Sequence, residues 1–421
     1  MKNKKQEFDI AVVGGGPAGM IAAIRAAELG AKTVLIEKNK GLGEKLLLTG
    51  NGRCNLTNAE FDLKKLVSHY GKKGSFLFHV FSVFGPKETI AFFNKIGIKT
   101  KTEGKNRVFP ASNSAADVLE LMFREIKNNK VVVLCNAEVK DIVCEKGSIK
   151  KIVLSEGEIT ARNYIFCTGG KSYPLTGSSG EVFQMIEKTG HKISALEPAL
   201  VPIKIKEDWI KELQGLSLEN VGISIWQSGK KIKTVIGDCL FTHFGLSGPA
   251  VIDLSRTVGD LLKIGEVKIF IDLNPALSRD QLEEKINDNF KNYHNKSLKN
   301  CLADFPPRKM VLAIARLSGI DPERKVNGLT KEERGRLFLL LKKIELTVES
   351  LLGFDLAMAT SGGVSLEEID DKTMRSKIIS NLFFAGEIID IDGETGGFNL
   401  QNCWSTGYLA GQSAAGFLKN K

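Results

Sequence analysis

The chain has 421 residues, 43% hydrophobic and 26% charged, which predicts a globular protein of two or three domains, and no apolar run is long enough for a membrane span. Its seven cysteines are odd in number and never form a C-x-x-C pair, which argues against a disulfide framework, a zinc site or a redox dithiol and favours a cytoplasmic protein. The net charge of +10 predicts a basic solvated surface. RNA or an acidic substrate is the alternative, although no RNA-binding motif is present.

The first predicted elements surround a G-x-G-x-x-G motif at Gly14–Gly19. Ile10–Val13 is a short apolar strand, and Met20–Leu29 is a helix whose positive N-terminal end follows the glycine turn. In such a turn the first glycine permits the tight bend and the second lets the backbone approach a pyrophosphate. The third lets the helix pack on the strand. The unit therefore predicts dinucleotide binding, with a purely structural glycine turn as the alternative.

A second strand, Thr33–Ile36, is followed by Glu37, which lies 18 residues after Gly19. A carboxylate at this place accepts hydrogen bonds from ribose hydroxyls and disfavours a 2′-phosphate. The strand–turn–helix–strand unit is thus compatible with FAD or NAD, and fits NADP less well.

Residues 41–58 form a glycine- and asparagine-rich segment that also contains Lys45 and Arg53. A nicotinamide dehydrogenase would continue here with another strand and helix, so the segment indicates backbone that lies against a phosphate or a flavin ring. Leu46–Leu48 predicts a short helix packed inward, which argues against the alternative of a flexible surface loop.

Helices are predicted within residues 61–100 and 114–126, and an antiparallel meander within 138–160. Asn163–Cys167 is an apolar strand that runs into the T-G-G turn Thr168–Gly170, where the backbone again comes close to the cofactor. The polar loop Lys171–Gly180 after it either lines a substrate cavity or simply connects two elements.

From His191 the pattern changes to strands, which continue to Asp272, and then to helices over Ser278–Lys343. Capping boxes of the S-x-x-Q and T-x-x-E type mark the starts of two of these helices, and a strand at Glu345–Leu352 follows them. No second strand–G-x-G-x-x-G–helix unit is present, so a separate nicotinamide domain is not expected.

The C-terminal part of the chain again carries cofactor-like features. An apolar strand, Ile378–Phe384, ends in Ala385-Gly386-Glu387, and a helix follows the double glycine Gly396-Gly397, so that its first N–H groups face whatever lies before it. Small residues on one side of this helix predict close packing against another element. Glycine motifs at both ends of the chain call for a longer, ring-bearing ligand, which favours FAD over NAD.

Seven motifs run along nearly the whole chain, namely GGGPAG, LLLTGNGRCNLTN, RVFP, TGGKSYPLTGSSG, THFGLSGP, TSGGV and AGEIIDIDGETGGFNLQNCWSTGYLAG. Together they resemble the HI0933-like flavoproteins, which include BaiN-like reductases and aminoacetone-oxidase-like proteins. The resemblance implies an α/β fold with a Rossmann-type, glutathione-reductase-like FAD-binding domain, an inserted β-barrel domain and a small helical domain. The predicted domains are residues 1–190 with 354–421 for FAD binding, 191–277 with 344–353 for the barrel, and 278–343 for the helices.

By their positions in these motifs, three groups of residues are implied in FAD binding. The N-terminal group meets the pyrophosphate and the adenosine ribose: Gly14, Gly15, Gly16, Pro17, Ala18, Gly19, Glu37 and Lys38. The middle group approaches the ribityl chain and ring or lies by the adenosine: Lys45, Asn51, Arg53, Cys54, Val139, Thr168 and Gly169. The C-terminal group contacts the ribitol and phosphates or the isoalloxazine: Gly386, Glu387, Gly396, Gly397, Phe398 and Asn399.

The resemblance implies an FAD-dependent oxidoreductase that takes electrons from NAD(P)H and passes a hydride to an organic acceptor, such as the carbon–carbon double bond of an enone-type or steroid-like acid. The same family includes an amine-type oxidation, so the substrate, a small molecule, stays open, as does the oligomeric state. No catalytic residue is identified; His243 and Tyr173, each in a glycine-rich segment, are acid–base candidates, with ordinary packed side chains as the alternative.

No metal, membrane or nucleic-acid partner is expected. Two other functions are considered. A non-catalytic, flavin-binding redox sensor belongs to a different class of protein, and a flavin-dependent RNA modifier is suggested only by the net charge.

Overall fold

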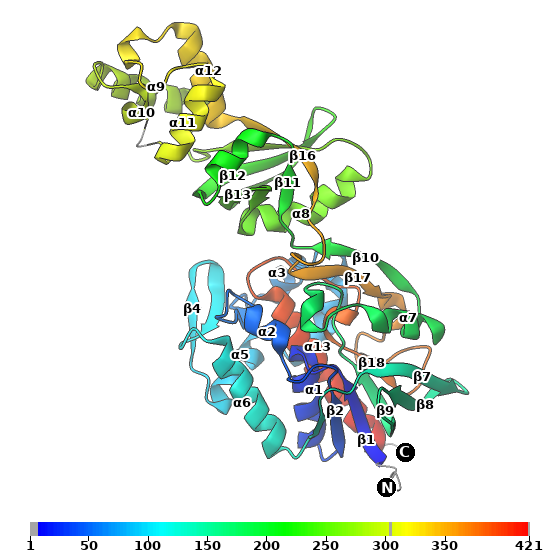
Figure 1. Cartoon of the computed structure of the whole chain (residues 1–421). Helices are drawn as coiled ribbons and strands as arrows, with labels where there is room; N and C mark the ends of the chain where they lie inside the picture. The colour runs from blue at the N-terminus through cyan, green and yellow to red at the C-terminus, as the bar shows by residue number, and fades with distance from the viewer. Residues whose placement is uncertain (1–6, 303–304, 420–421) are drawn as a thin grey trace. The chain divides into compact units, whose positions relative to one another are not determined.

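The computed structural model describes residues 7–302 and 305–419 and divides the chain into two units (Figure 1). The first unit consists of Met1–Ala199 and Phe354–Lys421, and the second of Leu200–Gly353. The first unit is therefore built from both ends of the chain, and the second is an insertion between them.

Five parallel strands form the centre of the first unit, in the order β6, β2, β1, β9 and β18. Their bounds are Val132–Leu134, Thr33–Ile36, Glu7–Val13, Glu158–Phe166 and Leu382–Phe384. This is the strand order of a Rossmann-type sheet, with the last strand supplied by the C-terminal part of the chain. The apolar runs of β1, β2 and β18 are buried, as strands covered on both faces require. The predicted fold class is confirmed.

Smaller antiparallel sheets complete the first unit. The predicted meander is confirmed, because β9 pairs with β8 and β8 with β7. The other two sheets have the order β3-β5-β4 and the pair β10-β17. The bounds of these strands are Val139–Glu145 (β7), Ser148–Leu154 (β8), Thr57–Asn58 (β3), Thr100–Glu103 (β4), Arg107–Pro110 (β5), Ile193–Ala199 (β10) and Ala359–Val364 (β17).

Two long helices of the first unit, α1 (Pro17–Glu28) and α13 (Phe398–Lys419), lie directly against each other (Figure 1). A Cβ atom at Gly407 would lie 2.3 Å from the carbonyl oxygen of Ala18, and one at Gly411 would lie 2.4 Å from that of Ala22. A step of four residues along α13, from Gly407 to Gly411, corresponds to a step of four residues forward along α1, from Ala18 to Ala22. The two helices therefore run in the same direction. Only glycine permits this backbone-to-backbone contact.

Shorter helices cover the remaining surface of this unit. Their bounds are Glu44–Leu48 (α2), Leu63–Ser68 (α3), Leu77–Val83 (α4), Pro86–Ile96 (α5), Ala115–Asn128 (α6) and Glu181–Lys188 (α7). Among residues 7–302 and 305–419, no helix combines the length and the apolar character that crossing a bilayer would require.

The second unit contains a closed barrel of six strands, in the order β11, β14, β13, β12, β15 and β16. Their bounds are Ile203–Ile205, Gly245–Ser247, Lys230–Phe241, Ser217–Gln227, Lys268–Asp272 and Ile344–Leu351. Its helices are Pro249–Leu262 (α8), Arg279–Asn292 (α9), Leu298–Cys301 (α10), Arg308–Leu317 (α11) and Lys331–Lys342 (α12). Ser278 and Thr330 form the two predicted capping boxes. Barrel and helices share one buried core, so a separate helical domain stays a prediction.

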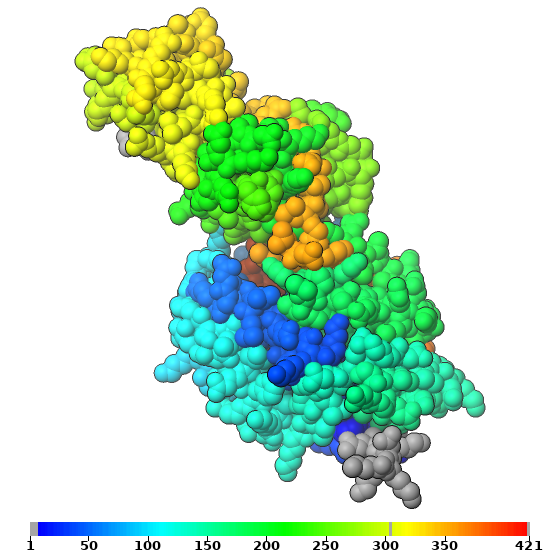
Figure 2. Space-filling model, viewed as in Figure 1, coloured from blue at the N-terminus to red at the C-terminus, as the bar shows by residue number. Residues whose placement is uncertain are grey.

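The structure differs from the sequence interpretation in two places. Residues 191–199 were assigned to the barrel, but β10 pairs with β17 and belongs to the first unit. In α2 only Leu46 packs inward, while Leu47 and Leu48 are 37% and 51% exposed, and this blue segment lies at the surface in Figure 2. A one-turn helix has a single buried face, so three consecutive leucines cannot all pack into the core.

The contact between α1 and α13 makes a prediction about stability. Replacing Gly407 by Ala forces the helices apart and should lower the free energy of unfolding by about 2 kcal/mol. Gly416 on the same helix has no protein atom near its would-be Cβ, so Gly416→Ala should stabilise by about 0.5–1 kcal/mol through helix propensity. Urea denaturation of both variants measures the two free energies of unfolding. Equal changes in Gly407→Ala and Gly416→Ala would contradict a close helix contact at Gly407.

Candidate functional site

A cavity of about 1400 Å³, part of it open to solvent, lies in the first unit at the carboxyl ends of the parallel strands. Val13, Ile36 and Cys167, at or just after the ends of β1, β2 and β9, line it. Open α/β sheets bind their ligands at this edge. The predicted cofactor-binding residues that line the cavity are Gly14, Gly16, Pro17, Ala18, Glu37, Lys38, Lys45, Val139, Thr168, Gly169, Glu387 and Asn399.

The glycine turn between β1 and α1 has the geometry that its sequence predicts. Gly14 has φ of +102°, and a Cβ there would lie 2.4 Å from the carbonyl oxygen of Cys167. A Cβ at Gly19 would lie 1.8 Å from the carbonyl oxygen of Gly14, which explains the close approach of helix and strand. At Gly16 a Cβ would meet no protein atom within 4 Å, so the space in front of α1 is open to a ligand.

Glu37 is held at the cavity wall by backbone groups. Its Oε2 accepts a hydrogen bond of 2.7 Å from the Gly15 amide, and its Oε1 accepts one of 2.8 Å from the Asn39 amide. Next to it, the Lys38 ammonium donates to the Ser179 hydroxyl at 2.7 Å. The carboxylate is thus fixed at the end of β2 and retains lone pairs for ribose hydroxyls, the role that the sequence predicts for it.

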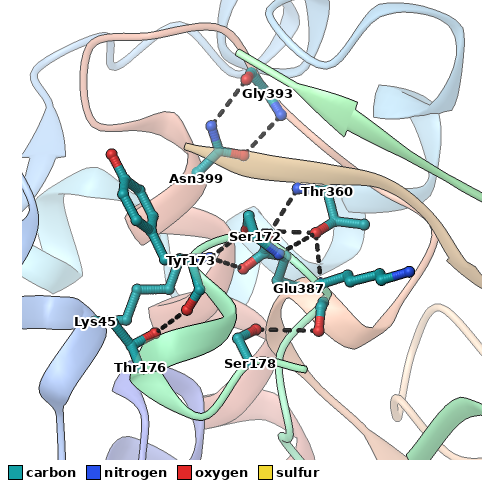
Figure 3. Close-up of polar contacts among 11 residues, drawn as sticks. Lys45, Ser172, Tyr173, Thr176, Ser178, Thr360, Glu387, Gly393 and Asn399 are labelled. Carbon is teal, nitrogen blue, oxygen red and sulfur yellow. Dashed lines mark hydrogen bonds and ion pairs between the residues drawn. The ribbon is translucent and has the colours of Figure 1, made fainter. Parts of the chain in front are cut away.

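A partly buried ion pair links the two ends of the chain at the cavity (Figure 3). The Lys45 ammonium lies 2.6 Å from Oε2 of Glu387 and donates to the Ser172 hydroxyl at 2.6 Å. Oε1 of Glu387 accepts from that hydroxyl at 2.6 Å and from the Thr360 amide at 2.7 Å. Burial alone would raise the pKa of Glu387, but the Lys45 charge and these hydrogen bonds outweigh it and hold the pKa below its ordinary value.

The start of α13 is fixed by its neighbours. Asn399 donates from Nδ2 to the carbonyl of Gly393 at 2.8 Å and accepts at Oδ1 from the amide of the same residue at 2.9 Å (Figure 3). The Tyr70 hydroxyl donates to the Phe398 carbonyl at 2.7 Å, and the His69 ring stacks on Phe398 with centroids 4.0 Å apart. These contacts hold the helix N-terminus at the cavity, where its positive end favours negative charge.

The remaining predicted residues do not line the cavity: Gly15, Gly19, Asn51, Arg53, Cys54, Gly386, Gly396, Gly397 and Phe398. The Arg53 guanidinium instead donates to Glu103 at 2.5 Å and stacks on Phe109. Cys54 is fully buried, and burial raises the pKa of its thiol to about 12, so it is not a reactive thiolate. The roles of these residues stay predictions.

The two acid–base candidates lie in different units. Tyr173 has φ of +50°, so its backbone is strained, and its amide donates to the Phe354 carbonyl of the same unit at 3.1 Å. Figure 3 places it beside Lys45 and Ser172, but it does not line the cavity. His243 belongs to the second unit, where its ring centroid lies 4.9 Å from that of Phe244. No catalytic role follows from either position.

Several cavity residues were missed from the sequence. Residues Thr176–Phe183, which are the end of the polar loop and the first residues of α7, line the cavity, and a substrate contact of the loop stays a prediction. Asn402 and Cys403 follow Asn399 at helical spacings of three and four on the same face of α13. That spacing was available in the sequence as a signal.

The family model described as HI0933-like protein Rossmann domain matches residues 8–413 of the chain. The chain belongs to this family. The 3-dehydro-bile acid delta(4,6)-reductase of Clostridium scindens is 32% identical over 411 residues, which cover 96% of this chain and 98% of that protein. The ribosomal RNA dihydrouridine synthase of Escherichia coli is 28% identical over 407 residues, which cover 97% of this chain and 98% of that protein.

Among solved structures, the 3-ketosteroid-delta4-(5alpha)-dehydrogenase of Rhodococcus jostii RHA1 has a similar fold, with a TM-score of 0.52 over 99% of this chain and 98% of that chain. The sequence identity is 16%, so this likeness concerns the fold alone. Family membership and fold together make this HI0933-like chain an oxidoreductase of the flavoprotein class, as its motifs predicted.

The cavity fits FAD. The open space at Gly16, in front of the N-terminus of α1, suits a pyrophosphate. Glu37 offers fixed acceptors at one side of that turn, and the N-terminus of α13 lies at the other. The open space at Gly16, the Glu37 carboxylate and the N-terminus of α13 therefore match a ligand with two phosphates, a ribose and a ring that becomes anionic on reduction.

The Lys45–Glu387 pair makes a prediction with a defined pH dependence. Glu387→Gln leaves the largely buried Lys45 ammonium without its carboxylate and should lower the free energy of unfolding by about 3 kcal/mol at pH 7. Since the pKa of Glu387 is lowered in the folded chain, the ionised form stabilises the fold above the ordinary pKa of a glutamate. This stabilisation disappears as the pH falls through the lowered pKa of Glu387, below the ordinary pKa of a glutamate.

Urea denaturation of the wild type and Glu387→Gln at several pH values measures this difference. The matched control is Lys45→Met combined with Glu387→Gln, which removes both charges and should recover most of the lost stability. If the free energies of unfolding of the wild type and Glu387→Gln differ by the same amount at pH 7 and at the lowest pH measured, the result would count against the ion pair.

Proposed function

We propose that this protein is an FAD-dependent reductase that saturates a carbon–carbon double bond conjugated with a carbonyl group, with NAD(P)H as electron donor. In the overall reaction the β-carbon of the double bond gains a hydride, the α-carbon gains a proton, and the nicotinamide is oxidised. The observation that carries the proposal is the full-length similarity to a reductase named for a 3-dehydro-bile acid and its delta(4,6) double bonds.

The second full-length relative supports the same reaction type. Its name describes the formation of dihydrouridine, in which the carbon–carbon double bond of uracil next to a carbonyl has become saturated. The two named substrates differ greatly in size and charge, but both present a conjugated double bond to a hydride donor. The reaction type is thus better supported than any one substrate.

When bound, FAD would supply a carrier that accepts two electrons from one molecule and delivers them as a hydride to another. The chain's own residues would do the rest. Gly14–Ala18 would bind the pyrophosphate, and Glu37 and Lys38 the adenosine ribose. The N-terminus of α13, held by Asn399, would stabilise negative charge at the ring. The Lys45–Glu387 pair would keep a charged side chain beside the ligand without leaving it unpaired.

NAD(P)H fits the role of a transient donor because the chain has a single G-x-G-x-x-G unit. The Rossmann site that would hold a resident nicotinamide is the one assigned to FAD. A donor that binds briefly, reduces the flavin and leaves needs no second domain of this kind.

Uridine in ribosomal RNA is the second candidate substrate. It is favoured by the name of the Escherichia coli relative and by the net charge of +10, which would attract a polyanion. A redox sensor without turnover is the third candidate, from a different class of protein.

An anaerobic turnover assay with purified protein, NADH or NADPH and two acceptors separates these functions. A 3-oxo steroid acid with a delta(4) double bond should be saturated at the expense of the nicotinamide, with little change between low and high salt. Saturation of uridine in ribosomal RNA instead, falling steeply as salt rises, would replace the steroid-type substrate with RNA. Bleaching of the flavin without turnover of either acceptor would contradict the reductase and favour the sensor.

A further inference from the structure

One side-chain oxygen in the cavity wall is buried without a hydrogen-bond partner among the residues that the structure describes. Asn402 is 2% exposed, lines the cavity, and its Oδ1 accepts no hydrogen bond from any residue in the described ranges 7–302 and 305–419. An unpaired buried amide oxygen loses its hydration without compensation, which is unfavourable, so most such groups in proteins have a partner. We propose that Asn402 binds the ribityl chain of FAD, its Oδ1 accepting a hydrogen bond from a ribityl hydroxyl. This inference rests on FAD as the cofactor.

The neighbouring polar side chains have partners other than Asn402. The Lys45 ammonium and the Ser172 hydroxyl are both directed at Glu387. The Thr406 hydroxyl donates to the backbone carbonyl of Asn402 at 2.5 Å, and accepts from the Gly386 amide at 2.9 Å. None of these groups donates to Oδ1 of Asn402, and the Thr406 contacts fix the backbone of Asn402 beside Gly386.

The parallel sheet shows which half of the ligand reaches Asn402. Glu37 stands at the end of β2, the glycine turn at the end of β1, and Gly386 just after the end of β18, on the other side of β9. Gly386 lies against the first turn of α1, since a Cβ there would lie 2.7 Å from the Ala18 side chain, and its strand is on the side of the turn away from Glu37. With the adenosine ribose at Glu37 and the pyrophosphate at the turn, the flavin half extends toward Asn402.

The helices give the same position independently. Gly407 of α13 touches Ala18 in the first turn of α1, and the two helices run in the same direction. Asn402 lies five residues before Gly407, which at 1.5 Å per residue is about 7 Å beyond that contact, past the N-terminus of α1. Asn399 lies further out along the same face. Asn402 is thus placed between the pyrophosphate and the ring.

The chemistry at this position selects the ribityl chain. Phosphate oxygens at neutral pH have no proton to donate, so the pyrophosphate cannot satisfy an amide oxygen. The ribityl chain, which joins the pyrophosphate to the ring, carries three hydroxyl groups, each a donor and an acceptor. A ribityl hydroxyl is therefore the first donor of FAD beyond the pyrophosphate that would complete the hydrogen bonding of Asn402.

The test compares ligand binding and folding in flavin-free, full-length protein. Asn402→Leu should weaken FAD binding about tenfold, the equivalent of one buried hydrogen bond. It should leave the affinity for ADP unchanged, because ADP contains the adenosine and phosphates but no ribityl chain. The melting temperature of the flavin-free protein should stay the same or rise, because no protein–protein hydrogen bond is lost. Asn402→Ala serves as a second variant with a smaller side chain.

The matched control is Asn163→Ala. Asn163 is also buried, but it does not line the cavity, and its Nδ2 donates to the Ala414 carbonyl at a distance of 2.9 Å. Asn163→Ala should therefore lower the melting temperature and leave the FAD affinity unchanged. Unchanged FAD affinity in the Asn402 variants would overturn the proposal, as would equal weakening of FAD and ADP. If the wild type binds no FAD, the proposed function fails. If the wild type binds FAD and the Asn402 variants bind it equally well, only this inference fails.

Discussion

The direct contact of α13 with α1 is the constraint on which the first unit depends. Gly407 and Gly411 let the C-terminal helix lie on the backbone of the first helix, and β18 joins the parallel sheet next to β9. As a result, the glycine turn from the N-terminal part of the chain and the Glu387 and α13 segment from the C-terminal part meet at one cavity. The ion pair between Lys45 and Glu387 joins the same two parts of the chain inside that cavity.

The sequence predicted the elements that rest on local patterns. The first β-α-β unit, the meander, the barrel strands and two capping boxes could be derived because apolar period, turn residues and caps act within a few residues of one another. The resemblance of the motifs to a flavoprotein family supplied the cofactor, and the family is confirmed.

Long-range partners could not be predicted from the same patterns. Leu47 and Leu48 are exposed because a short helix has one buried face, and the assignment of β10 was wrong because its partner, β17, lies far along the chain. The ion pair of Lys45 with Glu387 joins residues more than three hundred positions apart, which local spacing does not encode, whereas the helical spacing of Asn402 from Asn399 was a usable signal. For Arg53 the resemblance implied a contact with the flavin half of FAD; its side chain pairs with Glu103 and Asn113, and the FAD contact stays a prediction.

A single-turnover measurement tests the central claim, that a flavin in this cavity reduces a conjugated double bond. The flavin of the purified protein would be reduced chemically without oxygen and mixed rapidly with a 3-oxo-delta(4) steroid acid or with ribosomal RNA. The account predicts that one of the two reoxidises the flavin, with one double bond saturated for each flavin. A flavin that stays reduced with both, and is reoxidised only when oxygen is admitted, would contradict it.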